Sequence, residues 1–286
     1  MIGRLMTLAC ASALALALTT GAARAETLEV DGGRLWYETC GKGSTAIVLL
    51  HDGLLHSEGF DGVWQRLCRA FRVVRYDRRG YGRSPIPTAA YSPVEDLAAM
   101  LRALGLERAS LVGVSSGGGV ALNYALEHPD TVERLVLVGA AVDGLKTSDH
   151  FDKRNTRVAT PMIVGNVDGV IANAAKDPWL VAPGHDAARA TFVALMKANP
   201  QNIRRQVRSP ARASPPAPPR MPGLKVPTLI LTGEHDIPDV HAMAGAAQAL
   251  IAGSRREVVA DSGHLVQLEQ PEKLADLVAE FVRKGR

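Results

Sequence analysis

Short apolar segments alternate with amphipathic segments along most of the chain, and this alternation constrains the fold more than any other feature. Strands that alternate with helices form a mostly parallel sheet that is covered on both faces. Helical periodicity is clear in residues 93–104 and 118–127. Eight segments have the length and the Val, Leu and Ile content of buried strands: 27–30, 34–38, 46–50, 72–76, 110–114, 134–139, 228–233 and 256–260. The first two flank Asp31-Gly32-Gly33, a turn signal that predicts a hairpin. We therefore expect an α/β fold with an eight-stranded sheet.

One long segment interrupts the alternation. Residues 143–222 show helical periodicity but no convincing strand, and 186–199 place apolar side chains on one helical face. The segment ends in SPARASPPAPPRMP (209–222), which is too rich in proline for a helix or a sheet interior and predicts a stiff connector. The segment also holds twelve Lys and Arg against six Asp and no Glu. This excess of positive charge fits either an anionic substrate or a solvated helical face.

The amino-terminal residues predict an exported chain. Arg4 precedes an apolar run from Leu5 to Leu18, and Ala23-Arg24-Ala25 has the form of a signal-peptidase site. The run is short for a membrane anchor. We thus expect a signal peptide over 1–25, a core over 26–142 and 223–286, and a helical insertion over 143–222. Loss of Arg4 and Arg24 lowers the formal net charge from +4 to +2, which gives no indication of a nucleic-acid partner.

The segment LVGVSSGGGVAL (111–122) carries the first chemical signal. It lacks the lysine of a phosphate-binding loop and the last glycine of a dinucleotide-binding turn. The remaining pattern is G-x-S-x-G between a strand and a helix, which displays a serine on a strained turn. Small residues are needed two positions before and after that serine. Ser115 has Gly113 and Gly117 there, whereas Ser116 has the β-branched Val114, so Ser115 is the predicted nucleophile.

A serine hydroxyl needs a base, and the base needs an orienting acid. Asp236 follows the strand at 228–233, and His264 follows the strand at 256–260. The chain order Ser115, Asp236, His264 matches the order typical of this architecture. Other acids also lie close to strand ends in the sequence, namely Asp239, Glu234 and Asp143.

Acyl transfer also requires donors for the oxyanion. The backbone N–H of Ser116 is one candidate, because it directly follows the nucleophile. The second donor should come from the loop that follows the strand at 46–50, His51-Asp52-Gly53-Leu54. No metal site is needed for this chemistry, and although His235, Asp236, Asp239 and His241 lie close together in sequence, no H-E-x-x-H pattern is present.

These motifs resemble the α/β-hydrolase fold superfamily, in the branch that has a serine nucleophile and an inserted helical cap. The matching segments are LLHDG (49–53), YDRRGYGRS (76–84), GVSSG (113–117), LTGEHD (231–236) and DSGH (261–264). The resemblance implies that no cofactor is needed and that the substrate is a small molecule with an acyl bond, such as an ester or a lactone. Carbon–carbon bond hydrolysis, N-terminal proline peptidase activity and non-catalytic ligand binding are the alternatives. The resemblance also implies that YDRRGYGRS forms a structural turn.

The chain departs from the superfamily pattern at Asp52, where members usually have glycine in the sequence His-Gly-x. The departure leaves the second oxyanion donor open between Gly53, which we favour, and Leu54. A carboxylate at this position would weaken oxyanion stabilisation unless it points away or is paired. Two cysteines remain after the predicted leader, Cys40 and Cys68. In an exported chain they form either one disulfide or two separate buried thiols.

Overall fold

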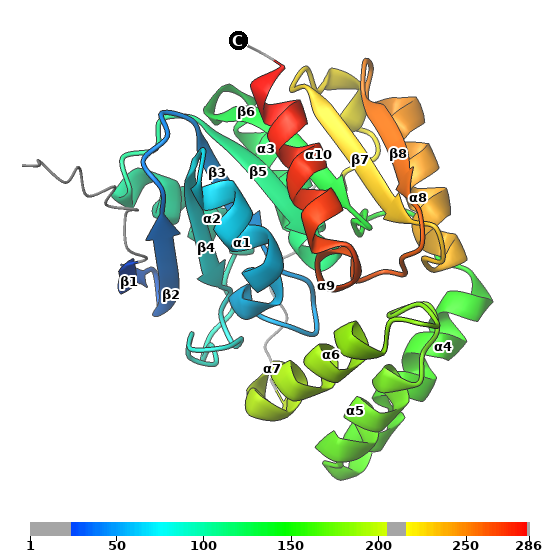
Figure 1. Ribbon diagram of the computed structural model, residues 1–286. Coiled ribbons are helices and arrows are strands. Elements are labelled where there is room, and N and C mark those ends of the chain that lie inside the picture. Colours follow the sequence, from blue (N-terminus) through cyan, green and yellow to red (C-terminus); the bar gives the residue numbers. More distant parts are fainter. Residues whose placement is uncertain (1–23, 205–215, 285–286) are drawn as a thin grey trace, which may run out of the picture.

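The computed structural model describes residues 24–204 and 216–284, and these residues form a single eight-stranded sheet with helices on both faces (Figure 1). The strand order is β1-β2-β4-β3-β5-β6-β7-β8. The first pairings, β1 with β2 and β2 with β4, are antiparallel, and all later pairings are parallel. The strands are β1 (Arg24–Val30), β2 (Gly33–Cys40), β3 (Ala46–Leu50), β4 (Arg72–Asp77), β5 (Ala109–Val114), β6 (Val132–Val138), β7 (Thr228–Gly233) and β8 (Arg255–Val259). The predicted fold class is thus confirmed.

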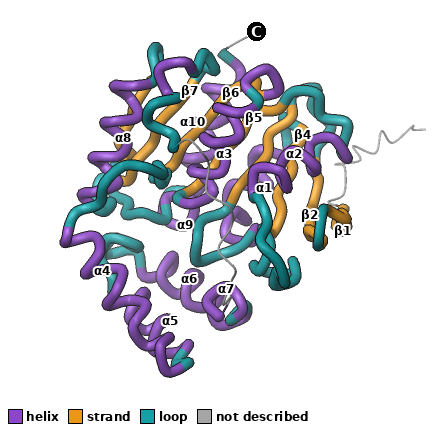
Figure 2. The backbone as a smooth tube through the Cα atoms, turned by 180° about the vertical axis from the view of Figure 1, so that it is seen from behind, coloured by secondary structure: helices purple, strands orange, loops and turns teal. Residues whose placement is uncertain are grey.

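Helices cover the two faces of the sheet unequally. The helices α1 (Asp61–Cys68) and α10 (Pro271–Arg283) pack on one face, and α2 (Pro93–Ala103), α3 (Ser116–Glu127) and α8 (Pro238–Leu250) pack on the other. Figures 1 and 2 show these two layers from opposite sides. Residues of β3, β5 and β6 are almost fully buried, because both faces are covered. The short helix α9 (Val266–Glu269) leads from β8 into α10.

Between β6 and β7 the chain leaves the sheet, and its described residues there form four α-helices. They are α4 (Asp149–Ala159), α5 (Val167–Ala175), α6 (Asp186–Ala198) and α7 (Gln201–Arg204), and we call this group the helical insert. Figure 1 shows the insert as a separate layer on one side of the core. Its own apolar cluster centres on Phe192 and Met196 of α6, which are fully buried. The polar sequence of α4 ends at a short 3-10 helix, Thr160–Val164, whose Ile163 and Val164 are exposed.

Two of the predictions fall partly outside the described residues. Of the predicted signal peptide, only Arg24 and Ala25 are described, and they begin β1 opposite Thr39 and Glu38. Residues 209–215 of the predicted connector also lie outside the described chain, and the remainder contains a 3-10 turn at Met221–Gly223. Among the helices that the structure describes, none is long and apolar enough to cross a membrane.

A disulfide joins Cys40, at the end of β2, to Cys68, at the end of α1. The two Cα atoms are 5.5 Å apart, within the usual range for a disulfide. The bond ties the antiparallel edge of the sheet to α1, and the two cysteines are 28 residues apart in the sequence. Of the two possibilities left open by the sequence, the structure contains the bridged one.

Candidate active site

Ser115 occupies the turn between β5 and α3. Its backbone has φ 52° and ψ −120°, a conformation that is costly for a residue with a side chain. The only other non-glycine residue with positive φ in the described chain is Asp261. The surrounding structure holds this turn, because the Ser115 N–H donates to the Val138 carbonyl at 2.9 Å and the Ser115 carbonyl accepts from Ala141 N–H at 3.0 Å. The strained turn presents the Ser115 side chain to a cavity.

The turn is possible only because its neighbours are glycines. A Cβ at Gly113 would lie 2.5 Å from the Gly117 carbonyl oxygen, and a Cβ at Gly117 would overlap the backbone carbonyls of Leu50 and His51. This is the crowding that the G-x-S-x-G spacing predicts. The helix α3 therefore begins against the end of β3, with its amino terminus beside Ser115.

His264 and Asp236 come together from the loops after β8 and β7. The Nδ1 atom of His264 lies 2.8 Å from Oδ1 of Asp236, and both side chains are buried. Because a carboxylate only accepts hydrogen bonds, Nδ1 carries the proton and Nε2 keeps a lone pair. Oδ1 of Asp236 also accepts from the Ile237 N–H at 2.7 Å, which fixes the carboxylate. The pair has the arrangement of a general base with its orienting acid.

The other acids considered from the sequence have different partners. Asp239 accepts from the N–H and hydroxyl of Ser148 at 2.7 and 2.8 Å, so it joins α8 to the start of the insert. Glu234 accepts from the Asp261 N–H at 2.9 Å. For Asp143 no contact with His264 is found in the described chain. Asp236 is thus the one acid of the four that is hydrogen-bonded to His264.

Gly139, at the end of β6, contributes to this pair without a side chain. It has φ 51°, and a Cβ there would lie 3.0 Å from both Asp236 Oδ2 and His264 Nδ1. Any other residue would therefore press on the acid–base pair. In the sequence, Gly139 is only the last residue of the predicted strand at 134–139, and its position directly after the apolar run was the available signal.

The insert holds the loop that carries His264. The His264 N–H donates to the Trp179 carbonyl at 2.8 Å, and the Leu265 N–H donates to the Leu180 carbonyl at 3.0 Å. The buried Glu269 carboxylate accepts from the N–H groups of Gly263 and Ala182. Burial raises the pKa of Glu269, and these two backbone donors counteract the rise. No sequence motif predicts this contact between residues 179–182 and the His264 loop.

Ser116 faces away from the cavity. Its hydroxyl accepts from Nη2 of Arg78 at 2.9 Å, and the same Nη2 donates to the Asp52 carbonyl at 2.7 Å. Arg78 is buried and stacks over the Tyr81 ring. It therefore ties the loop after β3 to the first residue of α3. YDRRGYGRS forms the expected turn around Asp77, whose carboxylate accepts from Ser57 and Arg83 N–H groups, but Arg78 extends from it into the site.

Both carboxylate oxygens of Asp52 accept hydrogen bonds. Its Oδ1 accepts from the N–H groups of Leu54 and Leu55 at 2.7 and 2.9 Å, and its Oδ2 accepts from Gln267 Nε2 at 3.1 Å. The Leu54 N–H is therefore already used. By contrast, the N–H groups of Gly53 and Ser116 have no hydrogen-bond partner in the described chain. Of the two candidate N–H groups, that of Gly53 is thus the one without a partner in the described chain, and the carboxylate that replaces the usual glycine is hydrogen-bonded.

The charges around His264 act in opposite directions. Burial, the largest single effect, lowers its pKa, but the charge and hydrogen bond of Asp236 and the charge of Asp52 together raise the pKa above the usual 6.5. The Arg154 guanidinium in the insert counteracts this rise. His264 is therefore a somewhat stronger base than an isolated histidine.

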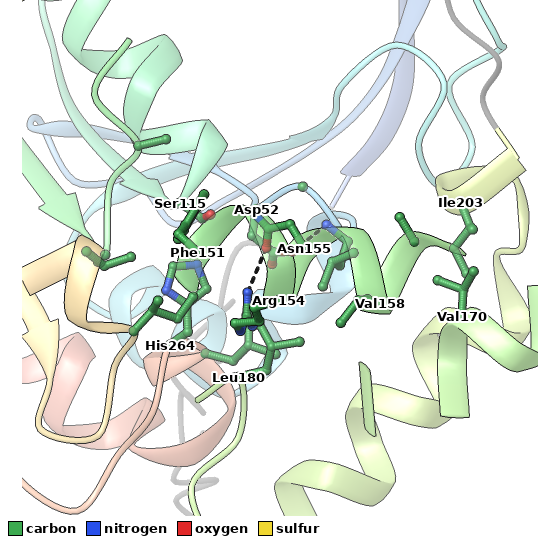
Figure 3. Close-up of a pocket in the computed structure, with 18 of the residues that line it drawn as sticks. Asp52, Ser115, Phe151, Arg154, Asn155, Val158, Val170, Leu180, Ile203 and His264 are labelled. Atoms are coloured by element: carbon green, nitrogen blue, oxygen red, sulfur yellow. Dashed lines mark hydrogen bonds between the residues drawn. The ribbon is translucent and has the colours of Figure 1, made fainter. Parts of the chain in front are cut away.

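Three of the predicted site residues, Gly53, Ser115 and His264, line a cavity of about 460 Å³ between core and insert. Asp52, Gly53, Ser115 and His264 line its core side. In Figure 3, Ser115, Asp52, His264 and Arg154 lie at one end, whereas Val158, Val170 and Ile203 lie toward the other. The cavity is lined mostly by apolar side chains, as is usual for small-molecule sites.

The residues considered as metal ligands do not gather in the described structure. The only group of described His, Cys, Asp and Glu side chains with metal-like spacing is Glu95, Glu127 and His128, none of which lines the cavity. Exposed carboxylates of this kind are common without a metal.

Comparison with known proteins decides the family. A model of the alpha/beta hydrolase family matches residues 47–277, most of the chain. The chain belongs to this family. The carboxylesterase YbfK of Bacillus subtilis is 28% identical over 85% of this chain and 82% of its own. Its crystal structure superposes with a TM-score of 0.75, covering 93% of each chain.

Other relatives carry out different hydrolyses on the same fold. A 2-hydroxy-6-oxononadienedioate/2-hydroxy-6-oxononatrienedioate hydrolase of Klebsiella pneumoniae is 24% identical over 93% of this chain and 98% of its own. A thermophilic esterase from Thermogutta terrifontis superposes with a TM-score of 0.76 at 23% identity, covering 91% of this chain and 98% of that chain. The family thus indicates a hydrolase, and the bond cleaved has to be argued from the site.

Proposed function

We propose that the protein is a serine hydrolase that cleaves an ester, a lactone or a related acyl bond in a small molecule. The observation that carries this proposal is that the strained Ser115 lines the same cavity as His264, whose Nδ1 is hydrogen-bonded to the buried Asp236. His264 Nε2 removes the hydroxyl proton as Ser115 Oγ attacks the acyl carbon. The oxyanion accepts from the N–H groups of Gly53 and Ser116. His264 then protonates the leaving group, and water releases the acyl-enzyme by the same route.

A fluorophosphonate probe tests the nucleophile directly. We expect it to label the wild-type protein at Ser115 and to leave Ser115→Ala unlabelled, while Ser116→Ala still reacts. Hydrolysis of p-nitrophenyl acetate should fall at least about 10⁴-fold in Ser115→Ala, as happens when a triad member is lost. A folded wild-type protein that neither reacts with the probe nor hydrolyses any ester would contradict the proposal and favour a non-catalytic binding protein.

Carbon–carbon bond hydrolysis is the second candidate, and the similarity to the Klebsiella pneumoniae hydrolase supports it. The same Ser115, His264 and Asp236 would serve both reactions. A substrate screen should therefore place p-nitrophenyl esters and lactones beside a vinylogous 1,5-diketone. Turnover of the diketone at a higher kcat/KM than any ester would favour the second candidate.

We further propose that the protein is exported and that the helical insert acts as a cap over the active site. The disulfide between Cys40 and Cys68 supports an oxidising compartment. Cleavage after Ala25 would leave Glu26 to Val30 paired with β2. Amino-terminal sequencing of the protein from fractionated cells tests the export proposal, because an intact Met1 on cytoplasmic protein would contradict it.

A further inference from the structure

Arg154 is the one strongly basic side chain among the residues that line the cavity. It lies on α4 of the insert and is 6% exposed. In the sequence it was only one of twelve basic residues in the insertion, most of which have no contact with the cavity. A buried arginine requires a specific reason, because desolvation of its charge is costly.

Only some of the N–H donors of the Arg154 guanidinium have acceptors in the described chain. Its Nε lies 2.8 Å from Oδ2 of the buried Asp177, an ion pair in which neither atom has a hydrogen bond of normal geometry, and its Nη1 donates to Asn155 Oδ1 at 2.8 Å. Its Nη2 is buried and has no hydrogen-bond partner in the described chain. The free donor therefore belongs to a side chain that lines the substrate cavity.

The guanidinium is held in a fixed place relative to the catalytic residues. Asp177, its ion-pair partner, also accepts from the Trp179 N–H at 2.9 Å, and the Trp179 carbonyl accepts from His264 N–H. Figure 3 draws Arg154 at the end of the cavity that holds Ser115 and His264. Burial lowers the pKa of Arg154, and the charges of Asp177 and Asp236 counteract this. The positioned cation thus lies at the same end of the cavity as Ser115 and His264.

We propose that Arg154 binds a carboxylate on the substrate, so that the protein prefers an ester or lactone that carries an acidic group on its acyl side or on its leaving group. This inference rests on the proposed hydrolase function and specifies its substrate class. The unused N–H groups of Nη1 and Nη2 form the outer edge of a planar fork, which matches the two oxygens of a carboxylate. Asp177 balances the charge when no substrate is bound, and the carboxylate supplies the acceptor that Nη2 lacks.

A simpler role for Arg154 would be to steady Asp236, whose Oδ2 also lacks a hydrogen-bond partner in the described chain. The guanidinium is not within ion-pair distance of Asp236, since the described ion pairs up to 4.0 Å link Arg154 only to Asp177. The two roles predict different kinetics. A role in steadying Asp236 affects all substrates equally, whereas carboxylate binding affects only the acidic ones.

The test uses two series of esters that differ only at one end. The first is a set of p-nitrophenyl esters whose six-carbon acyl chains end in a carboxylate, a primary amide or a methyl group. The second is a set of aryl acetates whose leaving groups carry a carboxylate, an amide or a methyl group. The two series place the acidic group on either side of the scissile bond. For each ester, kcat/KM is measured at low ionic strength for the wild type and the variants.

We expect Arg154→Met to lower kcat/KM for the carboxylate member of one series about 10- to 100-fold, the range of a charge-assisted hydrogen bond. The methyl member should change less than about threefold. Arg157→Met is the matched control, because it removes the same charge from the same helix at an exposed position that does not line the cavity. Arg157→Met should leave unchanged the ratio of kcat/KM for the carboxylate member to kcat/KM for the methyl member. Asp177→Asn, which leaves the Arg154 charge uncompensated, should raise the preference for the carboxylate.

Two results would overturn the inference. One is an unchanged ratio of carboxylate to methyl ester in Arg154→Met for both series, and the other is an equal loss for all esters. Arg154→Met leaves the buried Asp177 without its ion-pair partner, so Arg154→Met/Asp177→Asn serves as a second variant. The melting temperatures of both variants identify a folding defect. Calorimetry of monomethyl adipate binding to Ser115→Ala separates the carboxylate-site proposal from the hydrolase proposal. If the ligand binds through Arg154 while no ester is hydrolysed, the carboxylate site stands and the hydrolase function fails.

Discussion

The two sides of the cavity are built in different ways. The core side, with Asp52, Gly53, Ser115 and His264, comes from loops that follow parallel strands, and nearly all its polar atoms have partners or a proposed catalytic role. The insert side is apolar except for Arg154, Asn155 and Asn202. This difference indicates a division of labour. Under the proposed function, the core side would act on the acyl group that every substrate shares, and the insert side would distinguish one substrate from another.

The origin of the difference is the sheet. Parallel strands end at the same edge, so loops that are distant in sequence converge there and are held by buried backbone pairing. The helices of the insert have no such frame and pack around a smaller apolar cluster, which also includes Leu55 and Leu265 of the core. Changes on the core side should therefore affect all substrates alike, and changes on the insert side should affect them selectively.

The largest uniform effect is expected for Asp236→Asn. The amide cannot hold His264 in the tautomer whose Nε2 accepts a proton, so kcat should fall about 10⁴-fold for acidic and neutral esters alike. The melting temperature should change little, because the side chains have the same shape. Steady-state kinetics with both ester types measure the effect. A loss below about tenfold would mean that another acid orients His264, and Asp239→Asn is the matched control.

A smaller uniform effect is expected for Arg78→Met. Arg78 does not line the cavity, but it joins the Asp52 carbonyl to the Ser116 hydroxyl and so links the loops that carry the two proposed oxyanion donors. Loss of a direct oxyanion donor costs about 10²–10³ in kcat, and loss of its support should cost about 10- to 100-fold. The loss should appear in kcat rather than KM, and it should be the same for carboxylate and methyl esters.

Comparison with Arg154→Met makes this prediction sharp, because both variants exchange a buried arginine for methionine. If Arg78→Met changes the ratio of acidic to neutral ester, the proposed division between the two sides is wrong. Arg78→Lys should restore part of the activity, because an ammonium can reach one of the two acceptors. Ser116→Ala removes only the hydroxyl acceptor and should cost less than Arg78→Met.

The core side was largely predictable from the sequence. Ser115 was distinguished from Ser116 by the size of the flanking residues, and that crowding is present at Gly113 and Gly117. Asp236 and His264 were found because each follows a strand, and strand ends are set by short-range patterns. The boundaries of the strands differ from the prediction by a few residues, as at Arg24–Val30, where pairing with β2 extends the strand.

The insert side was not predictable, because its important contacts are long-range and use ordinary residues. Arg154 resembles any other basic residue of a polar helix, and its burial depends on Asp177, which is 23 positions later. The contact of Glu269 with Ala182 likewise depends on how the insert folds back on the core. The role of Asp52 was left open for a similar reason: its outcome depended on Gln267, which is distant in sequence.

The smallest effect on kcat/KM is expected for Asp52→Asn. The direction of its pH shift distinguishes the core side of the cavity from the insert side. The asparagine oxygen can still accept from the Leu54 and Leu55 N–H groups, and rotation of the Gln267 amide would present its unpartnered Oε1 to the new Nδ2. The plateau value of kcat/KM should therefore change less than about tenfold.

The pH dependence of Asp52→Asn carries the sharper information. In the wild type, the raised pKa of His264 places the acid limb of kcat/KM above the usual 6.5, since the base must be neutral to accept the serine proton. The Asp52 charge stabilises the protonated form, so its loss lowers the pKa and moves the limb to lower pH. Arg154 disfavours that form, so Arg154→Met should move the limb to higher pH with the neutral ester. If the acid limb moved in the same direction in both variants, the charges of Asp52 and Arg154 would not have opposite effects on the pKa of His264, and this prediction would be wrong.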